Sequence, residues 1–235
     1  NLAGMFEKHS IDGLLIANSE CELKPSLQID ALLITNKTIC IIEFKNYEGE
    51  IILPSISNFF ESQWLTKNNL IIKGGSTVNP YMQLRKQKAK FAEVFNNFVK
   101  NQLPENSKAD PSHTHKIVCF QKPIELKGSI PGRDELSFFI TDSVRYLDTI
   151  KDIIDVKDDE INLTKQSFNV FNKTFVAEKF DINEKYNDPP EIQSISTELE
   201  NEIPEESPSE ILGCWFFPRS ILGHFVILLI KKVTS

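Results

Sequence analysis

The sequence predicts an α/β (α+β) domain with a central mixed β-sheet flanked by helices. Short stretches rich in Ile and Leu, typical of buried strands, alternate along the chain with stretches that have helical periodicity. The composition, 40% hydrophobic and 25% charged with 17 Phe residues, is ordinary for a globular protein and supplies enough apolar volume for a core. This mixture of strands and intervening helices favours a layered α/β or α+β domain.

The elements follow in order from these patterns. Residues 1–10 fit the last turns of a helix, and we expect a strand before Gly74 and Gly75. Pro80 lies near the first turn of the most strongly predicted helix. The other expected strands are residues 13–17, 28–36, 37–45, 50–54, 115–121 and 136–141, and the expected helices are 80–100, 142–154 and 161–175.

Charge divides the chain into three parts. The net charge of the whole chain is −7, but residues 183–210 alone hold nine acidic residues and one Lys, which leaves a net charge of +1 for the rest. This segment is rich in Pro and poor in apolar residues, so we expect a disordered linker. We therefore predict a folded domain at residues 1–182, the linker at 183–210 and an apolar tail at 211–235, and a nucleic-acid partner is not excluded by the overall charge.

The apolar tail has two interpretations. The apolar run at residues 211–230 is about as long as a membrane span. Pro218, Arg219 and His224 interrupt it, and a charge in the middle of a span is costly. The tail is therefore either the start of another domain or a membrane-associated segment.

The strands at 28–36 and 37–45 predict a hairpin with a two-residue turn at Asn36 and Lys37. In that register Asp30 lies directly opposite Glu43, and opposed residues share one face of a sheet with Cβ atoms about 5 Å apart. Lys45 follows Glu43 by two residues, so it lies on the same face. Both faces of the hairpin are otherwise apolar, which is typical of central strands covered on both sides.

Two carboxylates together at the end of buried strands repel each other, and a divalent cation relieves that repulsion. Mg²⁺ takes oxygen ligands, often one or two carboxylates with water and phosphate, and Mn²⁺ could substitute. An ammonium group beside such an ion can orient water and stabilise charge on a phosphate. The arrangement suits phosphodiester hydrolysis, whereas the alternative is a purely structural cluster of ion pairs among Asp30, Glu43 and Lys45.

These residues resemble those of the nuclease-related domain (NERD) family, a branch of the PD-(D/E)XK nuclease superfamily. The ordered set consists of "QIDALLI" (28–34), "IIEFKNYEGEI" (41–51), the Trp of "SQWL" (62–65) and "GGSTVNPYMQLRKQ" (74–87). The resemblance covers about residues 11–100. It implies a restriction-endonuclease-like core that acts on DNA with Mg²⁺.

The resemblance also implies roles for individual residues. Asp30 and Glu43 would hold the metal ion together with the carbonyl of Phe44, Lys45 would be the catalytic lysine, and Gln83 would lie near the metal ion or the substrate. The chain departs from the superfamily pattern at one point. Many members have a Glu on a helix before the first strand, whereas Glu7 is the only acid in residues 1–10.

The helix at 80–100 is basic along its first half. Arg85, Lys86 and Lys88 precede the first acid of this helix, and they suit contacts to a phosphate backbone. The alternative is a solvated helix face. Gln83 and Gln87 are four residues apart and share a face of this helix.

Other candidates have simpler interpretations. Trp64 and Tyr47 could stack on a base, but core packing is favoured. His113 and His115 lack nearby acidic or Cys partners, so a loop or strand edge is favoured over a metal site. The segment "KGGSTVNP" lacks the P-loop pattern.

Function is predicted from these observations as Mg²⁺-dependent hydrolysis of DNA. The four cysteines form no C-x-x-C pair, which favours a reducing cytoplasm over a disulfide framework. Two rival classes stay open. One is a non-catalytic nucleic-acid-binding or regulatory module that keeps the nuclease fold, and the other is a membrane-tethered accessory protein. A fused or separate DNA-processing protein is the expected partner.

Overall fold

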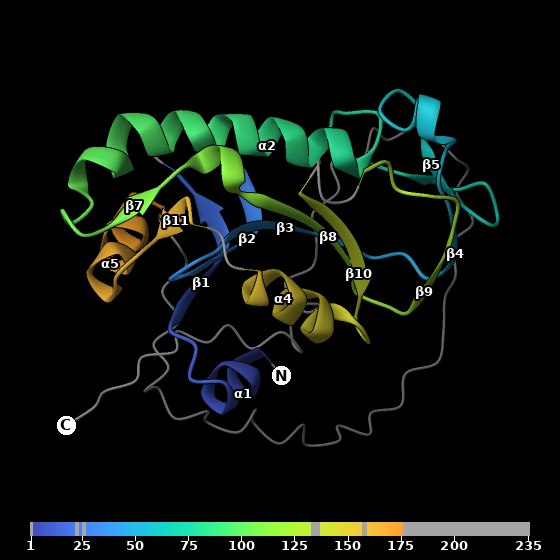
Figure 1. The fold of residues 1–235 in the computed structure, drawn as a ribbon. Helices are drawn as coiled ribbons and strands as arrows, with labels where there is room; N and C mark the ends of the chain where they lie inside the picture. The colour runs from blue at the N-terminus through green and yellow to red at the C-terminus, as the bar shows by residue number, and fades with distance from the viewer. Residues whose placement is uncertain (1, 22–23, 25–26, 133–136, 157–158, 176–235) are drawn as a thin grey trace, which may run out of the picture. The chain divides into compact units, whose positions relative to one another are not determined.

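The structure is a computed structural model that describes residues 2–21, 24, 27–132, 137–156 and 159–175 (Figure 1). Its centre is a five-stranded sheet in the order β1-β2-β3-β8-β10. The first three strands are antiparallel neighbours, whereas β3, β8 and β10 run parallel to one another. The predicted central mixed sheet is therefore confirmed. Its strands are β1 (Gly13–Glu20), β2 (Gln28–Thr35), β3 (Ile39–Lys45), β8 (His115–Phe120) and β10 (Phe138–Asp142).

The β2–β3 hairpin has the predicted register. The amide of Thr35 donates to the carbonyl of Thr38 at 2.8 Å, which closes a turn at Asn36 and Lys37. The ladder runs from Ile34, paired with Ile39, to Ala31, paired with Ile42. The ladder ends there, and the same register continued by one step sets Asp30 opposite Glu43, which is the arrangement that the sequence predicts.

Helices cover both faces of the central sheet, so the apolar residues of β2 and β3 divide into two clusters (Figure 1). Leu32 packs in one cluster with α2 (Pro80–Val94) and α5 (Lys165–Thr174). Leu33 packs in the other with α1 (Leu2–Lys8) and α4 (Tyr146–Asp155). Ile29 joins the α2 cluster, although strict alternation places it with Leu33. The regular β2–β3 ladder has already ended at Ala31, so alternation no longer fixes the side of Ile29.

The start of α2 is fixed by Asn79. Its side-chain oxygen accepts from the amide of Met82 at 3.0 Å, and its amide nitrogen donates to the carbonyls of Phe59 and Ser62. Pro80 occupies the first helical turn, as predicted. The predicted helix 80–100 is α-helical to Val94, and it continues as a π turn, η2 (Phe95–Val99), and a 3₁₀ turn, η3 (Lys100–Gln102). The π turn keeps Phe95 and Val99 both buried.

A second sheet has the strand order β6-β5-β4-β9. Trp64 is completely buried in it against Phe59 and Phe138, which confirms the packing interpretation for this residue. The sequence analysis did not predict β5 or β9. The strands are β4 (Gly49–Ile52), β5 (Trp64–Thr66), β6 (Ile71–Ile72) and β9 (Ile124–Lys127).

The predicted helix 161–175 begins later than expected. Its first two residues form a short strand, β11 (Ile161–Asn162), which pairs with β7 (Lys108–Ala109). A capping box between Thr164 and Ser167 then starts α5. The predicted linker at 183–210 and apolar tail at 211–235 lie outside the described residues. Among the described helices, none is long and apolar enough to cross a membrane.

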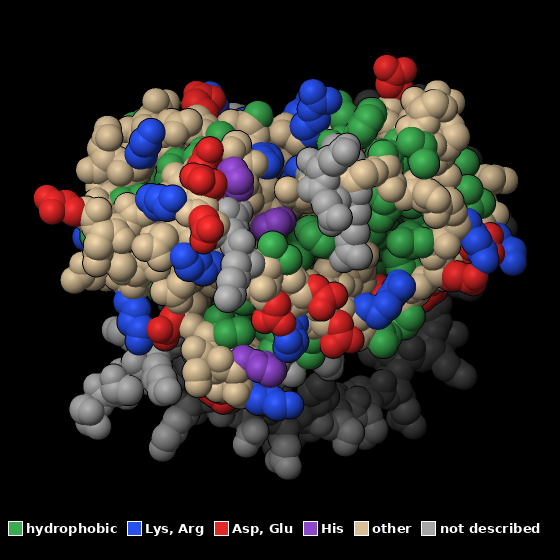
Figure 2. Space-filling model, in the orientation of Figure 1, with side chains coloured by type: hydrophobic (Ala, Val, Ile, Leu, Met, Phe, Trp, Pro, Cys, Tyr) green, Lys and Arg blue, Asp and Glu red, His purple; other side chains and the backbone are tan. Residues whose placement is uncertain are grey.

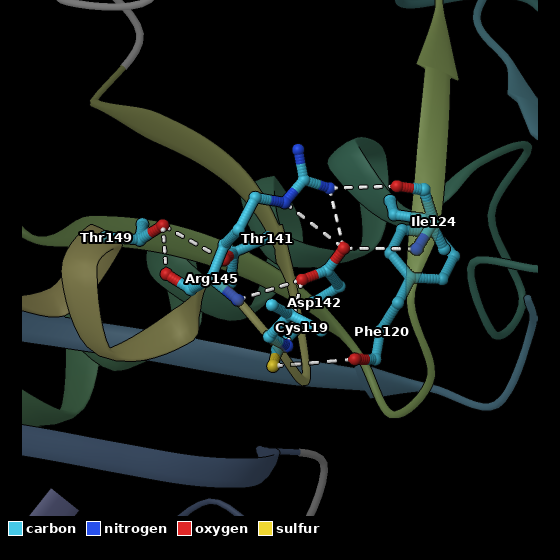
Figure 3. Close-up of polar contacts among 8 residues, drawn as sticks. Cys119, Phe120, Ile124, Thr141, Asp142, Arg145 and Thr149 are labelled. Atoms are coloured by element: carbon cyan, nitrogen blue, oxygen red, sulfur yellow. Dashed lines mark hydrogen bonds and ion pairs between the residues drawn. The ribbon is translucent and has the colours of Figure 1, made fainter.

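Asp142 joins the two sheets at the end of β10 (Figure 3). Its carboxylate accepts from the guanidinium of Arg145 at 2.6 Å and from the backbone amides of Ile124, Val144 and Arg145. Arg145 also donates to the carbonyl of Ile124 at 3.1 Å. Because β9 starts at Ile124, this network fixes β9 against the carboxyl end of the central parallel strands.

Candidate functional site

Asp30 and Glu43 lie together where the β2–β3 ladder ends. Asp30 Oδ2 accepts from the backbone amide of Phe44 at 2.8 Å, so the carboxylate takes the place of a ladder carbonyl at this point. The N–H and C=O of one strand residue point to the same side, so the Phe44 carbonyl also points toward β2. The structure therefore brings Asp30, Glu43 and the Phe44 backbone together, as the sequence predicts.

Glu43 is buried beneath α2 and accepts hydrogen bonds at both carboxylate oxygens. Its Oε1 accepts from Lys45 Nζ at 2.8 Å and from Gln83 Nε2 at 2.6 Å. Its Oε2 accepts from Gln87 Nε2 at 3.1 Å. Lys45 is also nearly buried, with 11% of its side chain exposed, and its Nζ donates to Gln83 Oε1 at 3.1 Å. Lys45 and Gln83 therefore lie where the sequence analysis places them, next to Glu43.

Gln87 is a site residue that the sequence analysis did not assign. Its Nε2 donates both to Glu43 and to the backbone carbonyl of Gln28 at 2.9 Å, so it connects β3, β2 and α2. The signal for it was present, because Gln83 and Gln87 are one helical turn apart and share a face. Only the family resemblance selected Gln83 over Gln87.

The Gly-Gly turn lets the chain approach the start of α2 closely. A Cβ on Gly74 would lie 2.0 Å from the carbonyl oxygen of Asn79, and Gly75 has a φ of +61° that favours glycine. Thr77 Oγ1 donates to the carbonyls of Gly74 and Asn79, which closes the turn. This turn therefore positions the N-terminus of α2, and with it Gln83, over the carboxylate pair.

The electrostatics of the pair centre on Asp30. Burial raises the pKa of Asp30, and the Glu43 carboxylate raises it further. The Phe44 amide and the Lys45 ammonium lower it, and the balance is a pKa of about 6, against 3.8 for an ordinary Asp side chain. A bound cation stabilises the ionised form of a carboxyl group whose pKa is raised by a second carboxylate, because the cation removes the repulsion between the two negative charges.

The donor set fits a magnesium ion. It consists of two carboxylates and one backbone carbonyl, and Mg²⁺ is often bound through one or two carboxylates with water and phosphate completing its coordination. Within the described ranges, no group of three or more His, Cys, Asp or Glu side chains is arranged to hold a metal ion. Asp30 and Glu43 form a pair of carboxylates, and a cation held there would need the Phe44 carbonyl and water as further ligands.

Glu7 does not supply the upstream acid of the superfamily pattern at this site. Glu7 is exposed on α1. The neighbouring Phe6 is buried in the cluster with Leu33, on the sheet face opposite to Leu32. Because Glu43 shares its face with Leu32, Glu7 and Glu43 belong to opposite sides of the sheet.

The three predicted nucleic-acid contacts on α2 do not form one patch. Arg85 and Lys86 are exposed, but they are adjacent residues and point about 100° apart around the helix. Lys88 is partly buried, and its Nζ donates to the carbonyl of Ser112 in η4 (Pro111–His113) at 2.5 Å. Arg85 and Lys88 lie near Lys116 of β8, whose pKa their charges lower.

The remaining candidate residues lie in contacts or elements that are typical of structural roles. Tyr47 donates its hydroxyl to the carbonyl of Ile71 at 3.2 Å. His113 ends η4, and His115 begins β8. The three described cysteines, Cys21, Cys40 and Cys119, are free and buried.

Comparison with known proteins gives one match. The family model described as nuclease-related domain matches residues 3–121, which is about half of the 235 residues. Comparisons with curated proteins and with solved structures find no match. The matched range contains the β2–β3 hairpin, the Gly-Gly turn, α2 and β8. The chain therefore belongs to the nuclease-related domain family.

Proposed function

We propose that the chain is a metal-dependent nuclease that hydrolyses DNA phosphodiester bonds. The observation that carries this proposal is the pair of opposed carboxylates, Asp30 and Glu43, with Lys45 beside them at the end of central strands. Two neighbouring carboxylates, of which Glu43 is buried and Asp30 half-buried, repel each other without a cation, and perturbed carboxyl groups gather at functional sites. The three cysteines in the described part of the chain are free and buried, which suits a reducing cytoplasm.

Each residue of the site would have its own role in the reaction. Asp30, Glu43 and the carbonyl of Phe44 would hold Mg²⁺, for which Mn²⁺ could substitute. A bound divalent cation stabilises charge on a phosphate and lowers the pKa of water. Lys45 orients the attacking water and balances negative charge near the phosphate. Gln83 fixes the relative positions of the Glu43 and Lys45 side chains, since it forms hydrogen bonds with both.

The direct test is a cleavage assay on single-stranded, duplex and branched DNA, with Mg²⁺ and with EDTA. Lys45→Ala is expected to reduce the cleavage rate by about 10²–10⁴-fold, because a side chain that assists the reacting water contributes about that much. DNA affinity should change little, since the role lies in the transition state. Lys37→Ala is the matched control, because Lys37 is exposed in the turn at the other end of the same hairpin.

Circular dichroism and thermal unfolding should show that both variants are folded. Cleavage by Lys45→Ala at the rate of the parent protein would contradict catalysis at this site. Loss of cleavage in Lys37→Ala as well would point to a general effect on the hairpin.

A non-catalytic nucleic-acid-binding module is the second candidate, and one observation favours it. Both oxygens of Glu43 already accept hydrogen bonds from Lys45, Gln83 and Gln87, so a cation must compete with these donors. In that case the protein binds DNA but cleaves none of the three substrates, with or without Mg²⁺. Its partner would then be a separate or fused DNA-processing protein that supplies the chemistry.

A further inference from the structure

Lys116 is a buried lysine that the proposed mechanism does not use. Only 5% of the residue is exposed, although it occupies a central strand. It pairs with Ile41 in the β3–β8 ladder, and alternation places it on the α2 side with Val118 and Phe120. Its Nζ lies 5.9 Å from the centre of the Tyr81 ring, and Tyr81 belongs to α2. Burial takes the ammonium group of Lys116 largely out of water.

Two further cations lie beside it. Burial lowers the pKa of Lys116 to about 8, and the charges of Lys88 and Arg85 contribute to the shift. The pKa of Lys88 is itself lowered by burial, while Asp110 raises it. Asp110 is exposed and is hydrogen-bonded to the amide of Ser112, and His113 and Lys100 lie near it. Tyr81, Arg85 and Lys88 follow one another at i, i+4 and i+7, so they share one stripe of α2. Lys116 of β8 lies against the Tyr81 ring of this stripe, which places the three basic residues on the same side of the helix.

This basic cluster, Arg85, Lys88 and Lys116, is separate from the carboxylate pair. On α2, Gln83 and Gln87 face Glu43. Arg85 and Lys88 are three residues apart and adjacent on the surface of the helix, on the stripe that also carries Tyr81, against which Lys116 lies. The helix therefore has the carboxylate site on one flank and the basic cluster on the other.

We propose that Arg85, Lys88 and Lys116 form a binding site for one phosphate group of the DNA backbone, between α2 and β8. The proposal rests on the proposed function, because it assigns the phosphate to the same substrate. Arg donates in a planar fork that matches phosphate oxygens, and Lys acts as a point charge, so this set suits a phosphate group. A bound phosphate offsets the mutual repulsion of the three cations. DNA that reaches both flanks of α2 would be anchored by this site while another phosphate lies at Asp30 and Glu43.

The first arm of the test uses inorganic phosphate on the metal-free full chain in EDTA. Thermal unfolding is followed in phosphate and in chloride at equal ionic strength. At about tenfold excess over Kd, phosphate should raise the Tm of the parent by about 3–6 °C. Arg85→Gln and Lys116→Met should abolish this rise. Lys86→Gln is the matched control, since it neutralises the adjacent residue on the same helix, and it should keep the rise.

The second arm asks whether the phosphate is that of DNA or a free anion. Binding of a fluorescent duplex is followed by anisotropy in EDTA over a range of salt. Arg85→Gln and Lys116→Met should weaken binding about 3–10-fold, and the slope of log K against log salt should flatten by about 0.9 if one phosphate is no longer neutralised. Disappearance of the phosphate effect with unchanged DNA affinity would overturn the assignment to DNA and leave a free-anion site.

Two outcomes in the first arm overturn the site itself. One is a parent Tm that phosphate does not raise, and the other is an equal rise in the parent and in both cluster variants. If Lys116→Met does not fold, the exposed Arg85→Gln decides the test by itself. Lys45→Ala should retain the phosphate response, because Lys45 is not part of this site. If the parent protein cleaves no DNA but still shows the phosphate response, the proposed nuclease function is refuted and this site is supported.

Discussion

Two aspartates of the central sheet, the buried Asp142 and the half-buried Asp30, have opposite electrostatic environments. Burial disfavours the charge of both, but Asp142 receives the Arg145 guanidinium and three backbone amides, which lower its pKa to about 2. Asp30 receives one backbone amide and lies beside Glu43, and its pKa is raised to about 6. The fold therefore stabilises the ionised form of Asp142, whereas the ionised form of Asp30 destabilises the folded state. Only the second pattern suits a site that gains from binding a cation.

The raised pKa of Asp30 predicts how stability depends on pH in the metal-free protein. A carboxyl group whose pKa rises from 3.8 to about 6 on folding favours the folded state below pH 4, and this contribution is lost as the pH rises through 6. Asp30→Asn removes the cost, so we expect it to stabilise the protein by about 1–3 kcal/mol at pH 7.5 and much less at pH 4.5. Urea unfolding in EDTA at the two pH values measures this difference.

The same variant tests the metal ligand. Mg²⁺ or Mn²⁺ should raise the Tm of the parent at pH 7.5 but not that of Asp30→Asn. Equal stabilisation of both proteins by the ion would show that Asp30 is not a ligand. A variant less stable than the parent at both pH values would show that the Asp30–Phe44 hydrogen bond outweighs the repulsion from Glu43.

At the scale of elements, the contacts of Asp142 predict a large loss of stability on mutation. Asp142→Asn should destabilise the protein by about 2 kcal/mol at pH 7, because the carboxylate joins β10, the start of α4 and β9. Asp155→Asn is the control, since Asp155 pairs with Lys151 on the surface of α4 and should cost at most about 0.5 kcal/mol.

The pKa of Asp142 fixes the sign of the pH effect. The lowered pKa stabilises the parent above about pH 4, and this contribution disappears as the pH falls through 2. The difference in the free energy of unfolding between the parent and Asp142→Asn should therefore shrink in acid. A difference that stays constant from pH 7 to pH 2 would mean that packing, and not the charge of Asp142, holds β9 in place.

The sequence was most informative where local rules determine the structure. The two-residue turn fixes the hairpin register as far as Ala31 and Ile42, so the neighbouring positions of Asp30 and Glu43 were predictable from the register, although the ladder ends just before them. The strands β5 and β9 were not predicted. The first has three residues, and the second alternates apolar and charged residues over only four, so their pairing with β4 depends on contacts distant in sequence.

The positions of the site residues could be predicted from the sequence where those residues lie on strands. The placement of Gln83 came from the family resemblance, whereas Gln87 was not assigned, because its contacts with Glu43 and Gln28 depend on how α2 packs on the sheet. The packing of α2 also explains why the arrangement of the basic residues was not predicted. Arg85, Lys86 and Lys88 are close in sequence, but the packing of α2 directs Arg85 and Lys88 toward Lys116, which a sequence pattern does not show.

At the scale of the whole molecule, charge outside residues 183–210 is nearly balanced. Those other residues carry a net charge of +1, and acidic and basic side chains are interspersed on the face that Figure 2 shows. A nearly neutral body gives little long-range attraction for DNA, so affinity must come from local groups of cations. Residues 85–90 hold four basic residues and no acid, which makes the first half of α2 the strongest candidate.

We therefore expect that neutral replacement of Arg85, Lys86 and Lys88 together makes the complex with DNA weaker and less dependent on salt. For duplex DNA, the slope of log K against log salt should flatten by about 0.9 for each phosphate that the variant no longer neutralises. If Arg85 and Lys88 share one phosphate and Lys86 binds another, the slope should flatten by about two units in the triple variant. The change should be equal for unrelated sequences, because backbone phosphates carry no sequence information. Anisotropy titrations of two unrelated duplexes from about 50 to 200 mM salt would measure it, and an unchanged slope would mean that these side chains form only a solvated helix face.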